Sequence, residues 1–171
     1  MVAAAKKGTV VPVGSAKQSA TQLERSAHDI ILQELPGFLI RRLDSRAAAV
    51  YEKFTGQSEL TPRQFGVLLT LFQSGPLAQT ELGNRLHLDR NTLGEMLQRM
   101  VEKKIVERRP HAHDRRAVEI ILTHAGKSAL LGTVQQALKA QEELLAPLPL
   151  YLRPVFLKCL EILAAAERPV D

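Results

Sequence analysis

The stretch that decides the fold runs from Leu60 to Lys127 and reads LTPRQFGVLLTLFQSGPLAQTELGNRLHLDRNTLGEMLQRMVEKKIVERRPHAHDRRAVEIILTHAGK. Two short helical patterns, separated by a turn at His87-Leu88, are followed by two strand-like segments around a basic tip. A helix, a turn, a second helix and a charged β-hairpin form a unit that can read duplex DNA. The stretch therefore predicts a winged helix-turn-helix.

Start and stop residues bound the helices of this stretch. Thr61 and Pro62 predict an N-cap and a first helical residue, and Ser74-Gly75-Pro76 predicts the end of that helix. The next helix is expected over residues 79–86. Asp89 is a good N-cap for the second helix of the motif. We assign its inner face to the apolar residues Leu93, Leu97, Met100 and Val101.

Strands are expected from Val106 to Arg109 and from Val118 to Leu122, with a turn-rich basic tip between them. Thr123 is a good cap for a long helix that continues to about Leu145. Pro147 and Pro149 break this helix, and a last helix is expected from about Tyr151 to Ala166.

The flanks carry apolar stripes at helical spacing. Helical patterning begins near Thr21, Pro36 fits the start of a new helix, and Gly56 is a stop signal. These stripes need a partner surface, and we favour a homodimer over packing within one chain. We expect a mainly α fold, a winged helix-turn-helix with a two-stranded β-wing and terminal dimerisation helices. The predicted regions are a mobile basic tail (1–20), dimerisation helices (21–57 and 124–166) and a DNA-binding region (58–123).

Composition excludes several classes of protein. The chain has 171 residues, of which 45% are hydrophobic, and a formal net charge of +5. Its one cysteine, Cys159, allows no intramolecular disulfide, and no apolar run is long enough to span a membrane, so we expect a cytoplasmic protein. No phosphate loop, nucleophile elbow or paired catalytic carboxylates are present, so we expect neither an enzyme nor a cofactor. His111 and His113 could chelate a metal, but a phosphate-contacting hairpin is the favoured interpretation.

The buried face of the second helix fixes the direction of its other face. Arginine can bind guanine and asparagine can bind adenine through paired hydrogen bonds, and threonine can touch a thymine methyl group or a phosphate. The residues that point away from the core, and that we expect to contact DNA, are Arg90, Asn91, Thr92, Glu95, Gln98 and Arg99. The alternative is a solvated helix face that binds nothing.

Positive charge is concentrated in the same region. Residues 85–116 hold nine basic and five acidic residues, a local charge of +4, so phosphate attraction should dominate non-specific affinity. At the hairpin tip, Arg115 or Arg116 could enter a minor groove, with Asp114 orienting one of them. The alternative there is a surface ion pair of little energetic value.

These residues resemble the MarR family of dimeric winged-helix regulators. The matching marks include Thr80-Glu81-Leu82, Asn91-Thr92-Leu93, Asp114-Arg115-Arg116 and Leu122-Thr123 with Gly126, and the resemblance extends over about residues 30–166. The chain departs from the family at Lys104, where glycine is common. A left-handed residue there costs roughly 1 kcal/mol without glycine.

The resemblance implies a transcriptional repressor that binds a near-palindromic operator as a dimer and is released by a small aromatic carboxylate. Residues 35–43, LPGFLIRRL, are similar to members that control aromatic-acid catabolism, including hydroxycinnamate and nicotinate pathways. The alternative from another class is a helical protein-interaction module with a winged fold that does not bind DNA.

Family pockets lie where the dimer helices meet the winged unit. Arg42 and Arg46 share one edge of the first long helix, next to its apolar stripe, and a guanidinium there could hold an aromatic carboxylate. The alternative is that these arginines pair with acidic residues across the dimer. The other residues expected to line an effector site are Phe38, Tyr51, Arg63 and Phe65.

Overall fold

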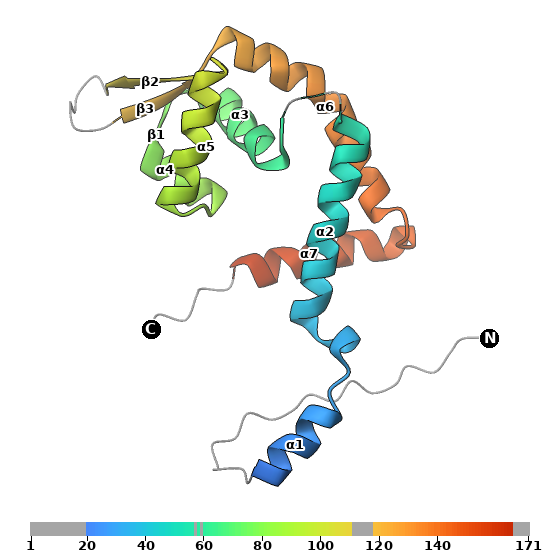
Figure 1. Cartoon of the computed structure of the whole chain (residues 1–171). Helices are drawn as coiled ribbons and strands as arrows, with labels where there is room; N and C mark the ends of the chain where they lie inside the picture. Colours follow the sequence, from blue (N-terminus) through green and yellow to red (C-terminus); the bar gives the residue numbers. More distant parts are fainter. Residues whose placement is uncertain (1–19, 57, 59, 111–117, 166–171) are drawn as a thin grey trace. The chain divides into compact units, whose positions relative to one another are not determined.

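The computed structural model describes residues 20–56, 58, 60–110 and 118–165 (Figure 1). The chain divides into a unit that ends at Ile40 and a unit that begins at Arg41. The first unit holds α1 (Ala20–His28), the 3-10 helix η1 (Leu32–Glu34) and the start of α2 (Pro36–Thr55). Pro36 therefore begins a helix and Gly56 follows its end, as the sequence predicts. The expected basic tail lies, apart from its last residue, outside the described residues.

The second unit is a mainly helical winged fold, which confirms the expected fold class. After the rest of α2 its elements are α3 (Pro62–Ser74), β1 (Leu77–Ala78), α4 (Gln79–Leu86), α5 (Arg90–Glu102), β2 (Val106–Pro110), β3 (Val118–Leu122), α6 (His124–Leu145), the 3-10 helix η2 (Leu150–Leu152) and α7 (Arg153–Ala165). The last helix begins later than expected, because residues 150–152 form a 3-10 turn. Pro154, which lacks an amide hydrogen, then fits the first turn of α7.

The sheet has three antiparallel strands in the order β1-β3-β2. The two predicted wing strands pair with Val106 opposite Leu122 and Arg108 opposite Ile120. The third strand, β1, pairs Leu77 with Ile120 and was not predicted, because two residues are too short to show an alternating pattern. It attaches the connection between α3 and α4 to the base of the wing.

The main core lies where α3, α4, α5 and α6 meet the sheet, and Figure 1 shows the three shorter helices beside the strands. Its largest fully buried side chains are Leu68, Leu71, Leu82, Leu93, Leu97, Met100, Ile120, Leu130, Val67 and Val106. The predicted inner face of α5 is correct for Leu93, Leu97 and Met100. Val101 is only half-buried, and Met96, which we had not assigned to this face, is 5% exposed.

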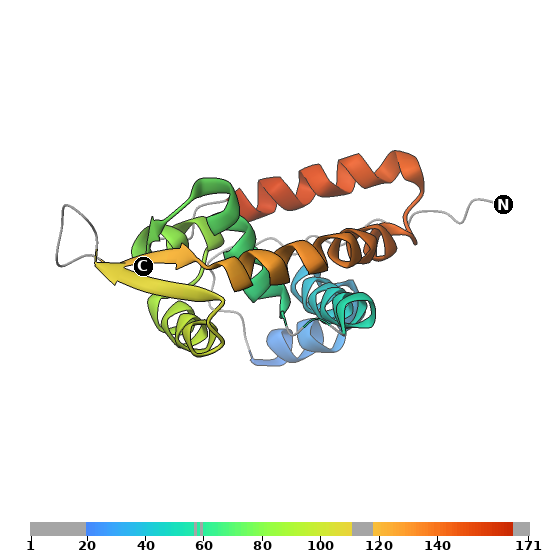
Figure 2. The same cartoon turned by 90° about the horizontal axis from the view of Figure 1, so that it is seen from above.

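A second, smaller cluster joins α2 to α6. Val50 and Tyr51 of α2 are buried with Ala137 and Ala140 of α6, and Phe54 and Phe65 pack against them. At the edge of this contact Lys53 donates to Glu143 (3.3 Å). Figure 2 shows the same two helices side by side when the molecule is seen from above. The small side chains of α6 therefore make room for the aromatic side chain of Tyr51.

The predicted helix caps are present. The Thr61 hydroxyl accepts from the Gln64 amide, and the Gln64 side chain accepts from the Thr61 amide, which is a complete capping box. The Thr123 hydroxyl caps α6 by accepting from the Gly126 amide (3.0 Å). Because these caps satisfy amides that have no partner within the helix, the helix starts could be located from the sequence.

The C-terminal end of α5 packs closely against the turn that leads into β2 and against the start of α6. Lys104 has a φ of 58°, in the left-handed region, and its amide donates to Val101 while that of Ile105 donates to Met100, as in a Schellman motif. A Cβ on residue 126 would overlap the Ile105 carbonyl oxygen, so α6 can approach this turn only through Gly126. Lys104, where the family commonly has glycine, therefore adopts a strained backbone conformation that glycine would adopt at a lower free energy.

Replacing Lys104 by glycine should stabilise the fold. A left-handed conformation costs a residue with a Cβ about 1–2 kcal/mol, and glycine loses about 0.5–1 kcal/mol more on ordering, so we expect a net gain of about 0.5–1 kcal/mol. Urea unfolding at one fixed protein concentration measures it. Lys103→Gly is the matched control and should destabilise, because Lys103 has an ordinary helical φ of −74°. Equal effects at both positions would contradict this account.

Candidate functional site

The first turn of α5 is held by Asp89. Its carboxylate accepts from the amides of Asn91 (3.1 Å) and Thr92 (2.9 Å). These hydrogen bonds, those from Thr92 first, hold the pKa of Asp89 below its usual value. The cap fixes where the helix begins and leaves the side chains of residues 90–92 to project from its first turn.

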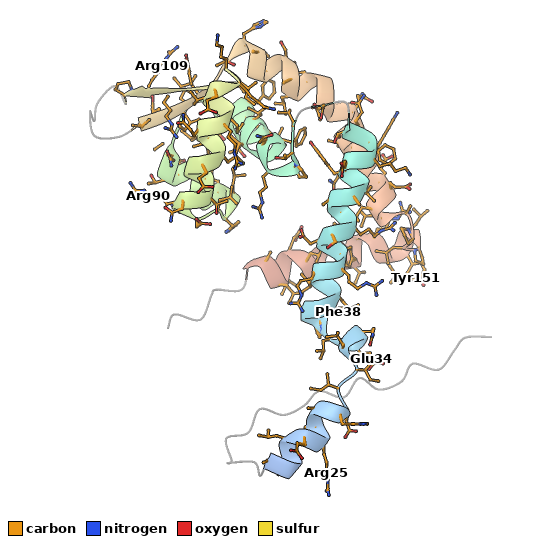
Figure 3. All side chains as sticks on the ribbon, in the orientation of Figure 1. Arg25, Glu34, Phe38, Arg90, Arg109 and Tyr151 are labelled. Atoms are coloured by element: carbon orange, nitrogen blue, oxygen red, sulfur yellow. The ribbon has the colours of Figure 1, made fainter. Side chains whose placement is uncertain are left out.

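The outer face of α5 is polar and accessible, as predicted. Arg90 lies at the start of the helix and points away from it (Figure 3). Asn91, Glu95, Gln98 and Arg99 are also exposed, whereas Thr92 is half-buried. The structure therefore brings the six predicted α5 residues together on one helix, opposite its buried face.

Arg108 is a further residue of this surface that the sequence analysis did not single out. From β2 its guanidinium donates to the Gln98 side-chain oxygen (3.4 Å) and the Gly94 carbonyl (3.5 Å) of α5. Alternation along the strand is the signal that could have found it. Arg108 lies two residues after buried Val106 and so shares the face that packs towards α5.

The opposite face of the wing carries an ion pair between Arg109 and Glu107. Both side chains are more than 40% exposed, so this pair adds little stability. The predicted hairpin-tip residues Asp114, Arg115 and Arg116 lie outside the described residues, as do His111 and His113. Their proposed contacts with DNA stay predictions.

Two of the residues expected in an effector site, buried Tyr51 and half-buried Phe65, form an aromatic pair. The rings of Tyr51 and Phe65 lie 6.4 Å apart at 64°, an edge-to-face contact between α2 and α3. Tyr51 is only 6% exposed, and its hydroxyl has no hydrogen-bond partner among the described residues. A buried hydroxyl without a hydrogen-bond partner costs free energy.

The Tyr51 phenol is protonated at neutral pH. Burial raises its pKa, and the Thr55 side chain has a smaller, opposite effect. The Thr55 hydroxyl donates its own proton to the Tyr51 carbonyl oxygen (2.8 Å). The phenol can therefore donate a hydrogen bond to a carboxylate or carbonyl oxygen.

The remaining predicted effector residues are more accessible. Arg42 and Arg46 are exposed on α2, and Arg63 is exposed in the first turn of α3. Phe38 is half-buried and belongs to the unit that ends at Ile40. The structure thus joins Tyr51 to Phe65 and leaves the three arginines at the surface.

Within the described ranges, no three His, Cys, Asp or Glu side chains gather where they could hold a metal ion. None of the helices in the described part of the chain is both long enough and apolar enough to cross a membrane.

The sequence and the fold are both similar to those of known transcriptional regulators. Residues 60–118 match the MarR family. Over 112 residues the chain is 30% identical to the transcriptional repressor NicR from Pseudomonas putida, covering 66% of this chain and 70% of the relative. The fold is similar to the PcaV regulator from Streptomyces coelicolor in complex with its natural ligand (TM-score 0.73, 27% identity, 81% of this chain and 98% of that chain). It is also similar to mutant MarR from E. coli complexed with operator DNA (TM-score 0.71, 26% identity, 81% and 99%).

The charge of Asp89 should make the stability of α5 depend on pH. Because the folded-state pKa of Asp89 is lowered, its contribution is complete above the pKa of the unfolded chain and is lost as pH falls through the folded value. Asp89→Asn keeps a capping side chain without the charge. Melting temperatures of the two proteins, measured from neutral to acid pH, should differ most near neutrality and converge in acid. A difference that stays constant with pH would contradict this assignment.

Proposed function

Because the chain belongs to the MarR family of transcriptional regulators, we propose that it is a dimeric, sequence-specific repressor that a small aromatic acid releases from its operator. Members of this family are DNA-binding regulators and not enzymes. The finer parts of the proposal are the dimer, the kind of effector and the direction of the response.

The outer face of α5 is the observation that carries DNA reading. Leu93, Leu97 and Met100 anchor the helix in the core, and Asp89 caps its start, so the side chains of Arg90 and Asn91 project from a fixed first turn. The first turn of a recognition helix is the part that reaches base edges. A guanidinium suits guanine and a carboxamide suits adenine in the major groove.

Unpartnered apolar surface supports a dimer. In the described chain α7 has no buried residue, and its Val155, Leu157, Ile162 and Leu163 are 47–64% exposed. A helix with so much exposed apolar surface marks an interface, and a second copy of the chain is the economical partner. A two-fold dimer would place two copies of α5 on a near-palindromic operator.

The Tyr51–Phe65 pair supports an aromatic effector. An aromatic acid offers a ring for stacking or edge contact with Phe65 and an oxygen for the unpartnered Tyr51 hydroxyl. Arg42 or Arg46 would supply the charge that balances its carboxylate. PcaV, to which this fold is similar, has been solved with its natural ligand. In the proposed function Tyr51 is therefore the central contact and the arginines lie at the rim.

Removing the proposed adenine reader should reduce specific binding. Asn91→Ala deletes a neutral side chain, so operator affinity should fall about 5- to 150-fold, which corresponds to the 1–3 kcal/mol of one base contact, while binding to unrelated duplex stays nearly constant. Fluorescence anisotropy with an operator selected from a random DNA pool measures both. Asn84→Ala, another exposed asparagine, on α4, is the matched control and should change neither. Equal loss on both DNAs would remove Asn91 as a base reader.

Removing the unpartnered hydroxyl should affect the response to effector and not the fold. In Tyr51→Phe the aromatic contact with Phe65 stays, so operator affinity should be unchanged and stability equal to or above that of the natural chain. Release of the operator by hydroxycinnamates and hydroxynicotinates should weaken. A thermal-shift titration gives an independent readout, since a ligand at 100 times its Kd adds about 2.7 kcal/mol.

Arg46→Ala completes this experiment. We expect it to abolish effector-induced release while sparing operator binding, because the effector carboxylate loses its counter-charge. Unchanged release in Arg46→Ala removes Arg46 from the site. Unchanged release and unchanged thermal shift in Tyr51→Phe would contradict the proposed effector site as a whole.

A further inference from the structure

A shallow groove of about 520 Å³, wide open to solvent, lies between α5 and β2 and is lined by Gly94, Glu95, Gln98, Arg99 and Arg108. It holds two guanidinium groups and one carboxylate, so its net charge is positive. Both arginines are exposed and open to solvent. The groove therefore suits an extended anionic ligand that passes between the helix and the wing.

The two groove arginines differ from neighbouring arginines, which are paired with carboxylates. Arg85 donates to Glu81 (2.6 Å) and to Ser74 (2.7 Å), and Arg109 pairs with Glu107. Neither Arg99 nor Arg108 has a carboxylate partner in the described part of the chain. Since a paired carboxylate offsets the field of its arginine, Arg99 and Arg108 keep more of their positive field than Arg85 and Arg109 do.

Arg108 is positioned without being neutralised. Its two contacts on α5 are the neutral oxygens of Gln98 and Gly94, at 3.4 and 3.5 Å. Both distances exceed the usual N–H···O distance of about 2.9–3.0 Å, so these hydrogen bonds are weak. They orient the guanidinium, and a charged acceptor can easily replace them.

Gln98 is already engaged within the protein. Its side-chain oxygen accepts from Arg108 and its side-chain nitrogen donates to Glu102 (3.0 Å). Reading adenine would require both ends of this amide. Gln98 also lies eight residues beyond Arg90, about 12 Å along the helix axis and away from the first turn. These contacts suit a residue that positions the Arg108 side chain of the wing.

We propose that this groove seats the phosphodiester backbone of one DNA strand, with Arg99 and Arg108 binding its phosphate oxygens and Gln98 acting as the positioning residue for Arg108. The proposal rests on the proposed function, because it takes the ligand to be duplex DNA. Guanidinium groups bind phosphate oxygens through paired hydrogen bonds. Glu95, on the same groove, would repel the phosphates and so direct the strand towards the arginines.

The salt dependence of binding tests this assignment. Each phosphate contact contributes about 0.9 to the slope of log affinity against log salt concentration. With the full chain, Arg99→Gln and Arg108→Gln should each lower that slope by about 0.9 per bound protomer, and together by about 1.8, on operator and unrelated duplex alike. Arg108→Lys, which keeps the charge, should keep most of the slope. Anisotropy titrations over about 50 to 200 mM salt give these values.

Arg109→Gln and Arg85→Gln are the matched controls, because each removes an arginine that already has a carboxylate partner. They should change the slope by well under half as much. The proposal is overturned if the groove variants keep the natural slope, or if Arg109→Gln lowers it equally. If the natural chain binds the two DNAs with a steep slope but the groove variants do too, only the groove assignment fails. If the natural chain binds neither DNA, the proposed function fails.

Gln98→Ala tests the positioning role separately. Loss of the side chain that orients Arg108 should weaken binding to operator and to unrelated duplex by the same factor, because phosphates carry no sequence information. A loss confined to the operator would make Gln98 a base reader and overturn its assignment. Circular dichroism melts of all variants establish that the compared proteins are folded.

Discussion

Burial of Leu93, Leu97 and Met100 fixes the rotation of α5 about its own axis, and the rest of the surface follows from it. With this face in the core, Arg90, Asn91 and Arg99 must face outward. The Asp89 cap then fixes where the helix starts, and the left-handed Lys104 fixes where it ends. A single buried stripe therefore determines which side chains face outward for the proposed contact with DNA.

Helix α6 contacts both the exit of α5 and the separate cluster that holds the proposed effector site. At its start, Gly126 packs on the Ile105 carbonyl and Thr123 donates to the Lys104 carbonyl (2.8 Å) at the exit of α5. Eleven residues later, about 16 Å along the helix, Ala137 packs in the cluster that buries Tyr51. In the proposed function, a ligand at Tyr51 would act on α5 by shifting α6, which is the element in contact with both.

Local chemistry made much of this fold predictable from the sequence. The caps at Thr61, Asp89 and Thr123 and the stop at Gly75 marked helix ends, and helical spacing marked the inner face of α5. Strand β1 could not be predicted, because two residues are too few to show an alternating pattern. Arg108 was not predicted as part of this surface, because its position depends on which helix the strand packs against. The hydrogen bond between Gln98 and Arg108 depends on the same long-range contact. The pairing of Tyr51 with Phe65 joins two helices that the sequence alone could not place together.

In the proposed function, two copies of α5 read the major grooves of one operator. Methylation interference at guanine N7 tests it most directly, since that atom lies in the major groove. We expect two clusters of interfering guanines about one helical turn apart, roughly 10 base pairs, related by the two-fold symmetry of the site. A single cluster, or protected DNA with no interference in the major groove, would contradict it.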